Sequence, residues 1–379
     1  MPNFYELFAG GGMARFGLGE EWNCVFANDF SEQKAKSYRT NWGDGELLVE
    51  DINKISLAAL PGHAELAWAS FPCQDLSLAG NGAGLNGERS STFWGFMKLI
   101  KGLRSEGRKP SIIVLENVYG TLTSHEGKDF EAIAKSVTSE GYNFGAIVVN
   151  AVQFVPQSRQ RVFIICIDEN LVTPNNAVCE RPSPSWHPEK IICAYNSLPK
   201  KVKNKWMWWN MPEPNQPLMT LDDIIEDEPV GVKWHTKKET QRILSLMTPL
   251  NRRKVLAAQQ SQNLKVGTIY KRTRDGIQRA EVRFDGIAGC LRTPSGGSSR
   301  QTIMVVEGPS IRSRLISPRE AARLMGLPEN YILPSRYNEA YHLIGDGVVV
   351  PVVAYINENI LLPVIEINAR RETQLCVGA

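Results

Sequence analysis

The first 170 residues alternate between short apolar runs and stretches in which apolar residues recur at helical spacing. The apolar runs, which predict strands, are Asn3–Phe8, Cys24–Asn28, Leu66–Ala69, Ser111–Leu115, Tyr142–Asn150 and Val162–Ile167. The stretches that predict helices are Met13–Leu18, Thr92–Leu103 and Phe130–Glu140. This alternation, with one strand apolar throughout, indicates an α/β domain that contains buried parallel strands.

The pattern changes after about residue 172. Residues 172–217 are rich in Pro, Asn and Trp, and glycines separate the β-prone residues between 267 and 297. Ser317–Pro328 then carries helix signals, and Gly345–Leu362 is an apolar helix candidate with Pro351 in its first turn. The predicted division is 1–172 for a first domain, 173–306 for an irregular, β-rich domain, 307–335 for a hinge and 336–379 for a return to the first domain.

Composition places the chain among ordinary globular proteins, since 42% of its 379 residues are hydrophobic and 22% are charged. Seven cysteines without a CxxC pair argue against a disulfide framework and against a zinc site. No signal peptide is visible, and the apolar segment Val348–Ile367 is interrupted by Asn357, Glu358 and Asn359. We therefore expect a cytoplasmic protein with no metal and no membrane span.

Charge is unevenly distributed along the chain. Residues 251–300 hold eleven Lys or Arg against three acids, a local balance of +8, whereas the whole chain carries +3, so the remainder carries −5. We call residues 251–300 the basic island. Concentrated positive charge of this kind indicates a surface that binds a polyanion, because a solvated face usually alternates its charges.

The segment Trp68–Gly80 joins a strand end to a reactive side chain. The apolar run stops at Phe71-Pro72, Cys73 follows, and four glycines lie between positions 80 and 87. A thiol at the carboxyl end of a strand is well placed to act as a nucleophile in an α/β enzyme. A lone cysteine is more often a small buried residue, so this hypothesis needs support from the rest of the chain.

Other polar residues also follow predicted strands. A glycine turn, Ala9–Gly12, and the acid Asp29 are typical of nucleotide-binding α/β units, although the missing GxGxxG spacing disfavours a nicotinamide cofactor. Glu116 ends a buried strand and is a surface acid, an ion-pair partner or a catalytic group. Arg159 and Arg161 share one face of an extended segment, where they either pair with acids or hold an anionic or carbonyl-rich ligand.

Six motifs, in this order, resemble those of the bacterial DNA cytosine-5 methyltransferase family. They are Phe8-Ala9-Gly10-Gly11-Gly12, Phe71-Pro72-Cys73-Gln74, Glu116-Asn117-Val118, Gln157-Ser158-Arg159-Gln160-Arg161, Arg319-Glu320 through Gly326-Leu327-Pro328, and Gly345-Asp346-Gly347. The resemblance covers about 1–170 and 310–360, and the basic island falls where the family has its variable target-recognition region. One departure is Asp346, since the family usually has Asn there.

The resemblance implies a Rossmann-like catalytic domain that binds S-adenosylmethionine, with a smaller, irregular, β-rich target-recognition domain. The cofactor would lie along the Phe8–Gly12 turn, with its ribose on Asp29 and its adenine near Phe30, Asp51 and Ile52. The residues that the resemblance assigns to the cofactor are Phe8, Ala9, Gly10, Gly12, Asp29, Phe30, Asp51, Ile52, Pro72 and Asp346.

For catalysis, the resemblance implies that Cys73 attacks C6 of a cytosine flipped out of duplex DNA. Glu116 in its protonated form would stabilise N3 of the ring, Arg161 would bind O2, and Arg159 would support the site. No side chain is evident as the base that removes the C5 proton. The residues expected to contact double-stranded DNA are Gln74, Ser77, Arg272, Arg274, Arg279, Arg283, Arg292 and Arg300.

Three alternatives stay open at this point. An RNA cytosine-5 methyltransferase of the transfer-RNA type would have a much smaller recognition region than the hundred or more residues here. A nicotinamide-dependent oxidoreductase lacks support from the glycine spacing. A non-catalytic DNA-binding protein on the same scaffold would not need the thiol, the carboxylate and both arginines. We expect a monomer, with a restriction endonuclease of the same target site as a possible partner.

Overall fold

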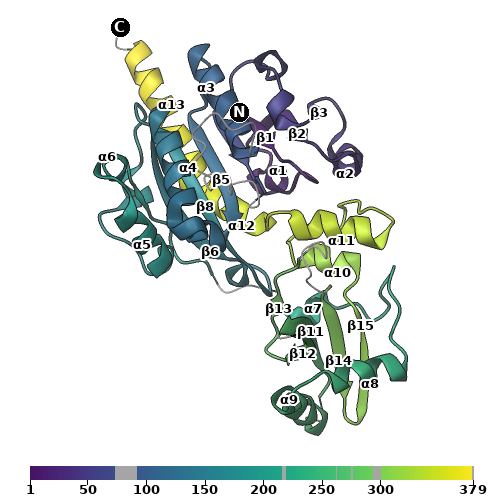
Figure 1. The fold of residues 1–379 in the computed structure, drawn as a ribbon. Helices are drawn as coiled ribbons and strands as arrows, with labels where there is room; N and C mark the ends of the chain where they lie inside the picture. Colours follow the sequence, from purple (N-terminus) through teal and green to yellow (C-terminus); the bar gives the residue numbers. More distant parts are fainter. Residues whose placement is uncertain (73–91, 216–218, 262, 275, 293–299, 378–379) are drawn as a thin grey trace. The chain divides into compact units, whose positions relative to one another are not determined.

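The computed structural model describes residues 1–72, 92–215, 219–261, 263–274, 276–292 and 300–377. The chain forms two compact units (Figure 1). Unit 1 comprises Met1–Val149, Gln160–Glu213 and Val352–Ala379, and unit 2 comprises Asn150–Arg159 and Pro214–Pro351. Each unit has its own sheet, as the change of pattern along the sequence predicts.

Unit 1 is built on a seven-stranded sheet with the order β3-β2-β1-β4-β5-β8-β6. Its strands are β1 (Asn3–Leu7), β2 (Asn23–Asp29), β3 (Leu47–Val49), β4 (Leu66–Ala69), β5 (Ile112–Val118), β6 (Tyr142–Asn150) and β8 (Gln160–Asp168). Strands β1 to β5 are parallel to one another, and β8 runs antiparallel to β5. The carboxyl ends of β1, β2, β4 and β5 therefore meet at one edge of the sheet, and we call this edge the catalytic edge.

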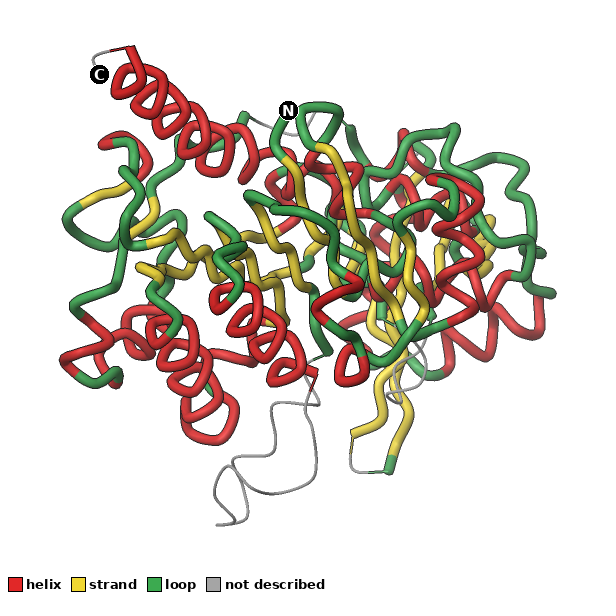
Figure 2. The backbone as a smooth tube through the Cα atoms, turned by 90° about the horizontal axis from the view of Figure 1, so that it is seen from above, coloured by secondary structure: helices red, strands yellow, loops and turns green. Residues whose placement is uncertain are grey.

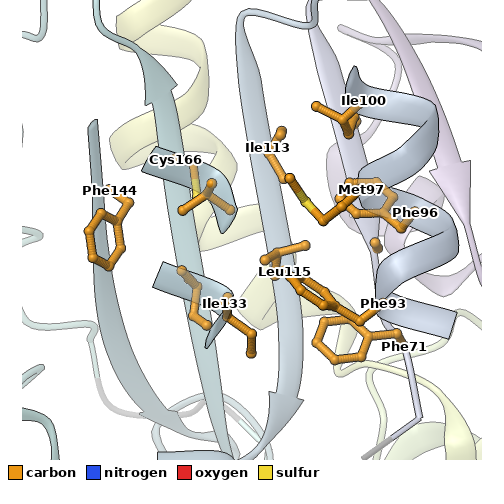
Figure 3. Close-up of a cluster of buried hydrophobic side chains, with 14 of the residues drawn as sticks. Phe71, Phe93, Phe96, Met97, Ile100, Ile113, Leu115, Ile133, Phe144 and Cys166 are labelled. Atoms are coloured by element: carbon orange, nitrogen blue, oxygen red, sulfur yellow. The ribbon is translucent and has the colours of Figure 1, made fainter. Parts of the chain in front are cut away.

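One face of this sheet is covered by α3 (Thr92–Ser105) and α4 (Lys128–Ser139), which pack on it through apolar side chains. Figure 3 shows Phe93, Phe96 and Met97 of α3 against Ile113 and Leu115 of β5. These side chains are at most 5% exposed. The helical spacing in the sequence thus predicts both helices.

The opposite face is covered by α1 (Met13–Leu18) and by α12 (Val350–Ile356) and α13 (Leu362–Val377) at the end of the chain (Figures 1 and 2). Asn357, which is 3% exposed, joins these elements: its side chain accepts from Trp22 Nε1 at 2.7 Å and donates to Leu18 O at 3.0 Å. The run Tyr337–Arg371 is long and apolar enough to cross a membrane by length and composition, yet half of its most apolar window is buried. It is a core helix region.

Residues 173–213 belong to unit 1, whereas the sequence places the change of domain at 172–173. They cover β6, the last strand of the sheet: Phe144 N donates to Lys205 O at 2.9 Å, and Met207 N donates to Phe144 O at 2.7 Å. Trp209 is fully buried and donates to Ile165 O at 3.2 Å. An uncovered edge strand leaves backbone groups unpaired, and this irregular segment satisfies them. Trp209 is thus a core residue of unit 1, and Trp206 and Trp208 are partly buried and pack against that core.

Unit 2 contains a four-stranded antiparallel sheet with the order β12-β11-β14-β15. Its strands are β11 (Lys265–Arg274), β12 (Ile277–Arg283), β14 (Thr302–Glu307) and β15 (Ser310–Leu315). One face packs on α8 (Lys237–Ser245) and α9 (Pro249–Gln260) through a small apolar cluster. The predicted β-rich character of this region is confirmed.

The predicted helix at 317–328 is shorter in the structure, where α10 spans Pro318–Arg323. Ser317 and Glu320 form a capping box, as the Ser-Pro-x-Glu pattern indicates. Glu320 also forms a fully buried ion pair with Arg314 of β15, at 2.6 Å. Gly326, with a φ of 73°, turns the chain soon after the helix ends. This arrangement fastens α10 to the sheet of unit 2.

Candidate active site

The catalytic edge of unit 1 brings together the ends of the strands that the sequence singled out. The glycine turn follows β1, Asp29 is the last residue of β2, Phe71 and Pro72 follow β4, and Glu116 lies near the end of β5. In open α/β sheets, ligands bind outside the carboxyl ends of the strands. These strand-end residues of the candidate site therefore all belong to unit 1.

The glycine turn is held in an unusual backbone conformation. Phe8 and Gly10 have φ angles of 61° and 58°, in a region that residues other than glycine rarely adopt. Asp29 braces the turn from the neighbouring strand, because its Oδ2 accepts from Gly10 N at 2.9 Å and its Oδ1 accepts from Ser31 N at 2.8 Å. A carboxylate has about four lone-pair sites, so Asp29 keeps acceptor capacity for a ligand hydroxyl.

Trp42, the last residue of α2 (Glu32–Trp42), closes the other side of the turn. Its indole N–H donates to Gly11 O at 3.2 Å, and the Arg15 guanidinium lies over its ring at 4.3 Å. Arg15 in turn bonds Tyr38 and forms an ion pair with Glu46. Sequence reasoning missed Trp42, because nothing local connects the end of this helix to the turn.

We expect Gly12→Ala to weaken S-adenosylmethionine binding by about tenfold or more. Gly12 has a φ of 75°, where an L side chain costs roughly 1–2 kcal/mol, and a Cβ there would also overlap the Trp42 indole nitrogen. Calorimetric titration of the cofactor gives the readout. Gly62→Ala is the matched control, because Gly62 has a φ of 57° and open space around it. Equal cofactor affinity in the Gly12 variant and wild type would contradict this role of the turn.

The residues at the cofactor side of the edge fit a nucleoside. Phe30 is 79% exposed directly after β2, which leaves an aromatic face open for a base to stack upon. Asp51 caps the short helix Ile52–Lys54, since its Oδ1 accepts from Asn53 N at 3.0 Å, and Ile52 is 3% exposed. No cluster of His, Cys, Asp and Glu able to hold a metal ion occurs in the described part of the chain.

Glu6 lies on β1, under the turn, and is 1% exposed. Burial raises the pKa of its carboxyl from 4.5 to about 8, partly offset by the hydrogen bond that Oε1 accepts from Arg15 N at 3.2 Å. The second oxygen, Oε2, is buried and has no hydrogen-bond partner among the described residues. Glu6 is therefore protonated in the folded protein at neutral pH.

This burial predicts a pH dependence of stability that Glu6→Gln should remove. As pH rises from about 4.5 to about 8, the unfolded chain ionises Glu6 and the folded protein keeps the proton, so the wild type loses stability. Urea unfolding at pH 5 and pH 8 should show a smaller loss in the Gln variant. The exposed Glu21→Gln should behave as wild type, and parallel profiles for wild type and Glu6→Gln would rule the effect out.

Asn117 connects the ends of β4 and β5. Its Nδ2 donates to Phe71 O at 3.1 Å, and its Oδ1 accepts from Val118 N at 2.8 Å and from Thr121 Oγ1 at 3.0 Å. The side chain is 3% exposed, so these bonds form in a water-poor interior. Asn117 thus fixes the chain two residues before Cys73. Cys73, Gln74 and Ser77 lie outside the described residues.

Glu116 and Arg161 form an ion pair at the catalytic edge. Arg161 Nε lies 3.1 Å from Glu116 Oε1, and Glu116 is only 7% exposed. The antiparallel register pairs Glu116 with Phe163 and Val118 with Arg161, so the two side chains are diagonal neighbours on one face. The structure thus brings together two of the predicted catalytic residues.

Arg159 lies in unit 2, and its side chain is directed at backbone. It is 2% exposed and donates to Leu291 O at 3.0 Å, Gly345 O at 3.1 Å and Gly347 O at 2.7 Å. These last two carbonyls flank Asp346, which is the last residue of α11 (Tyr337–Asp346) and is exposed. Arg159 therefore organises the Gly345-Asp346-Gly347 segment.

The arginines of the basic island have different surroundings in unit 2. Arg283 pairs with Asp285, and Arg300 bonds Asn338 and lies over the Tyr337 ring. Arg272, Arg279 and Arg292 are exposed. Arg274 ends β11, and its side chain is outside the described part of the protein.

Comparison with known proteins agrees with this arrangement. The family described as C-5 cytosine-specific DNA methylase matches residues 2–362. The chain belongs to this family. Its relatives include the type II methyltransferase M.HhaI of Haemophilus parahaemolyticus, 25% identical over 366 residues that cover 94% of this chain and 93% of that protein. Another is M.HpaII of Haemophilus parainfluenzae, 27% identical over 380 residues, covering 94% of this chain and 88% of that protein.

Solved structures give the same fold. The Dnmt2 methyltransferase of S. pombe has a TM-score of 0.59 at 17% identity and covers 96% of this chain and 99% of its own. The methyltransferase EhMeth of Entamoeba histolytica has a TM-score of 0.60 at 15% identity and covers 95% and 97%. The predicted methyltransferase fold is confirmed. As a C-5 cytosine-specific DNA methylase, the chain is a DNA cytosine-5 methyltransferase, and S-adenosylmethionine is the cofactor of its family.

Proposed function

We propose that this methylase transfers the methyl group through a covalent bond between Cys73 and C6 of a flipped cytosine. The observation that supports this most directly is the Glu116–Arg161 ion pair between β5 and β8. β5 lies next to β4, and Asn117 of β5 holds Phe71, two residues before Cys73. Two groups able to manage charge on a pyrimidine ring thus belong to the same sheet edge as the segment that leads to the thiol.

The chemistry requires a thiolate because C5 of cytosine is a poor nucleophile. Addition of the Cys73 sulfur to C6 makes C5 electron-rich, so that C5 can bond to a methyl group. Bound S-adenosylmethionine supplies that methyl group on a sulfonium centre. Water then takes the proton from C5, the electrons of that C–H bond re-form the C5–C6 double bond, and the C6–S bond breaks so that Cys73 leaves as its thiolate.

Glu116 and Arg161 have complementary tasks in this scheme. Addition at C6 places negative charge on the ring, and a proton delivered to N3 from Glu116 stabilises it. Arg161 donates to O2 of the cytosine. In the free enzyme the two side chains pair with each other. Arg159 acts at a distance by holding the backbone around Asp346.

The remaining assignments are those that the family resemblance implies, and the positions of the strand ends and the charge of unit 2 support them. The cofactor contacts are those of the Phe8–Gly12 turn, Asp29, Phe30, Asp51, Ile52, Pro72 and Asp346, and residues 1–172 with 336–379 form most of the catalytic domain. Gln74, Ser77 and the basic-island arginines contact duplex DNA. The protein acts as a cytoplasmic monomer and protects DNA from a restriction endonuclease of the same target site.

Bisulfite sequencing of DNA from methylation-deficient cells that express this chain tests the proposal. We expect cytosine methylation at one short recurring sequence, present with the wild type and absent with Cys73→Ser. Methylation of transfer RNA without methylation of DNA would support the RNA alternative. Light scattering on a sizing column should give one chain of 42.3 kDa.

A further inference from the structure

Unit 2 contains a cavity between α9 and one end of its antiparallel sheet. The cavity holds about 450 Å³, and its walls include Lys254 and Ala257 of α9, Lys265 at the start of β11, and residues 283–285 at and after the end of β12. Sites for small molecules usually have volumes of about 300–1,000 Å³. We call this space the α9 cavity. It belongs to unit 2, whereas the catalytic edge belongs to unit 1.

The walls of the α9 cavity are held in place by hydrogen bonds near both ends of the helix. Near the start of α9, Asn251 Oδ1 accepts from Val282 N of β12 at 3.0 Å. Near its end, Gln259 Nε2 donates to Pro309 O at 3.1 Å. Between these bonds α9 packs on the sheet through the apolar cluster (Figure 1). Fixed walls need little reorganisation to accept a ligand, which lowers the cost of binding.

Two lysines make the α9 cavity positive. Lys254 and Lys265 are both exposed, and neither forms an ion pair with a described residue, although Lys254 Nζ donates to Val282 O at 3.2 Å. The other two charged wall residues pair with each other, since Arg283 Nε donates to Asp285 Oδ1 at 2.7 Å. Three cations and one acid give the walls a net charge of +2. The cavity therefore attracts an anionic group.

Phe284 gives the α9 cavity an aromatic wall. Its ring is close to Gly267 of β11, because a Cβ added at Gly267 would lie 2.6 Å from Phe284 Cε1. The ring also packs against the apolar cluster and is partly buried, so its position is fixed. An aromatic ring that borders a cavity offers a surface on which a flat ligand group can stack. Beside it, the 53% exposed side chain of Asp285 is able to accept a hydrogen bond from a hydroxyl or amino group.

We propose that the α9 cavity binds a nucleoside monophosphate, with the base stacked on Phe284 and the phosphate held by Lys254 and Lys265. Ammonium groups form charge-assisted hydrogen bonds to phosphate, and any base can stack on an aromatic side chain. The bases of a DNA duplex are stacked on their neighbours and do not reach a ring inside a cavity. The ligand is therefore a free nucleotide, and this site is additional to the one that transfers the methyl group.

Calorimetric titration of the full-length enzyme with guanosine monophosphate tests the inference. Saturating S-adenosylmethionine is present throughout, so that the cofactor site is filled and cannot take the nucleotide. We expect one nucleotide per chain, with an affinity that falls as salt rises, because the two lysines are exposed. Inorganic phosphate should bind about tenfold or more weakly than the nucleotide, because it has no base to stack on Phe284.

Lys254→Met and Lys265→Met should each weaken nucleotide binding about three- to tenfold, because each removes a cation and keeps most of the apolar stem. Phe284→Leu should weaken it about tenfold, since leucine keeps an apolar side chain but offers no ring for stacking. Phe284→Tyr keeps the ring and should bind the nucleotide as wild type does, which separates stacking from any loss of folding in the Leu variant.

Lys238→Met is the matched control for the lysine changes. Lys238 is also an exposed lysine of unit 2, but it lies on α8 and does not line the α9 cavity. Its substitution should leave nucleotide affinity unchanged. The melting temperatures of the lysine variants should match that of wild type, because these side chains are exposed.

Four results would overturn the inference. The first is no binding of the nucleotide to wild type saturated with S-adenosylmethionine. The second is equal affinity for inorganic phosphate and the nucleotide. The third is unchanged affinity in Lys254→Met, Lys265→Met and Phe284→Leu, which would place the nucleotide elsewhere. The fourth is loss of nucleotide binding in the presence of saturating duplex DNA, since the cavity would then take a phosphate of the duplex. None of these results bears on methyl transfer, which bisulfite sequencing tests separately.

Discussion

DNA that carries 5-fluorocytosine in the target site should form a denaturation-resistant adduct with this enzyme, and Cys73→Ala should form none. After the sulfur has added to C6 and the methyl group to C5, turnover needs loss of the hydrogen on C5. Fluorine cannot leave as a proton does, so the covalent complex accumulates. Denaturing electrophoresis of enzyme, labelled DNA and S-adenosylmethionine gives the readout.

The chain contains its own controls for this experiment. It has six further cysteines, of which Cys24 and Cys166 are buried, and burial raises the pKa of Cys24 to about 12. Cys193 is exposed, and Cys193→Ala should form the adduct as wild type does. Omitting S-adenosylmethionine should prevent trapping. An adduct that survives Cys73→Ala, or that maps to another cysteine, would falsify the assignment of the nucleophile.

Glu116→Gln should slow methyl transfer about a hundredfold or more while DNA and cofactor affinities stay near wild type. Glutamine is close in shape and can place its amide oxygen near Arg161, but it has no acidic proton to deliver to N3. Single-turnover kinetics with saturating DNA and cofactor measures the chemical step directly. If the variant were slow because it misfolds, its melting temperature would also be lower than that of wild type.

Glu32→Gln is the control for this change. Glu32 also forms an ion pair with an arginine, Arg39, at 2.7 Å, but it lies on α2 with a 61% exposed side chain. Its substitution should change neither stability nor rate measurably, because exposed ion pairs contribute about 0–1 kcal/mol. Near-normal turnover in Glu116→Gln would remove Glu116 from the mechanism and leave charge control on the ring to Arg161.

Most of the sheet of unit 1 and the positions of its strand-end residues could be predicted from the sequence. Buried parallel strands are continuous apolar runs, so Leu66–Ala69 and Ser111–Leu115 are visible without any knowledge of their partners. Parallel strands place their carboxyl ends at one edge, which brings the glycine turn, Asp29 and Glu116 to that edge. The six motifs, in their order along the chain, then indicate which reaction the residues at this edge carry out.

The tertiary structure decided what depends on contacts between distant segments. Residues 173–213 have no periodicity, and only their pairing with β6 assigns them to unit 1. Trp42 bonds the glycine turn because α2 ends beside that turn. Asn117 bonds Phe71 because β4 and β5 are neighbours in the sheet. Local sequence patterns indicate which face of a helix or strand is buried, but they do not indicate which residue of another element packs against that face.

The same reason separates the arginines of the basic island. In the sequence they are equivalent cations within fifty residues, and Arg159 and Arg161 differ by two positions on one segment. Folding commits Arg159 to carbonyls of unit 2, pairs Arg161 with Glu116 and leaves Arg272 and Arg279 exposed as cross-strand partners. The sequence by itself determined which residues carry charge and where strands end. Which arginines bond backbone carbonyls, which pair with acids and which stay exposed depended on the register of strands that are far apart in the chain.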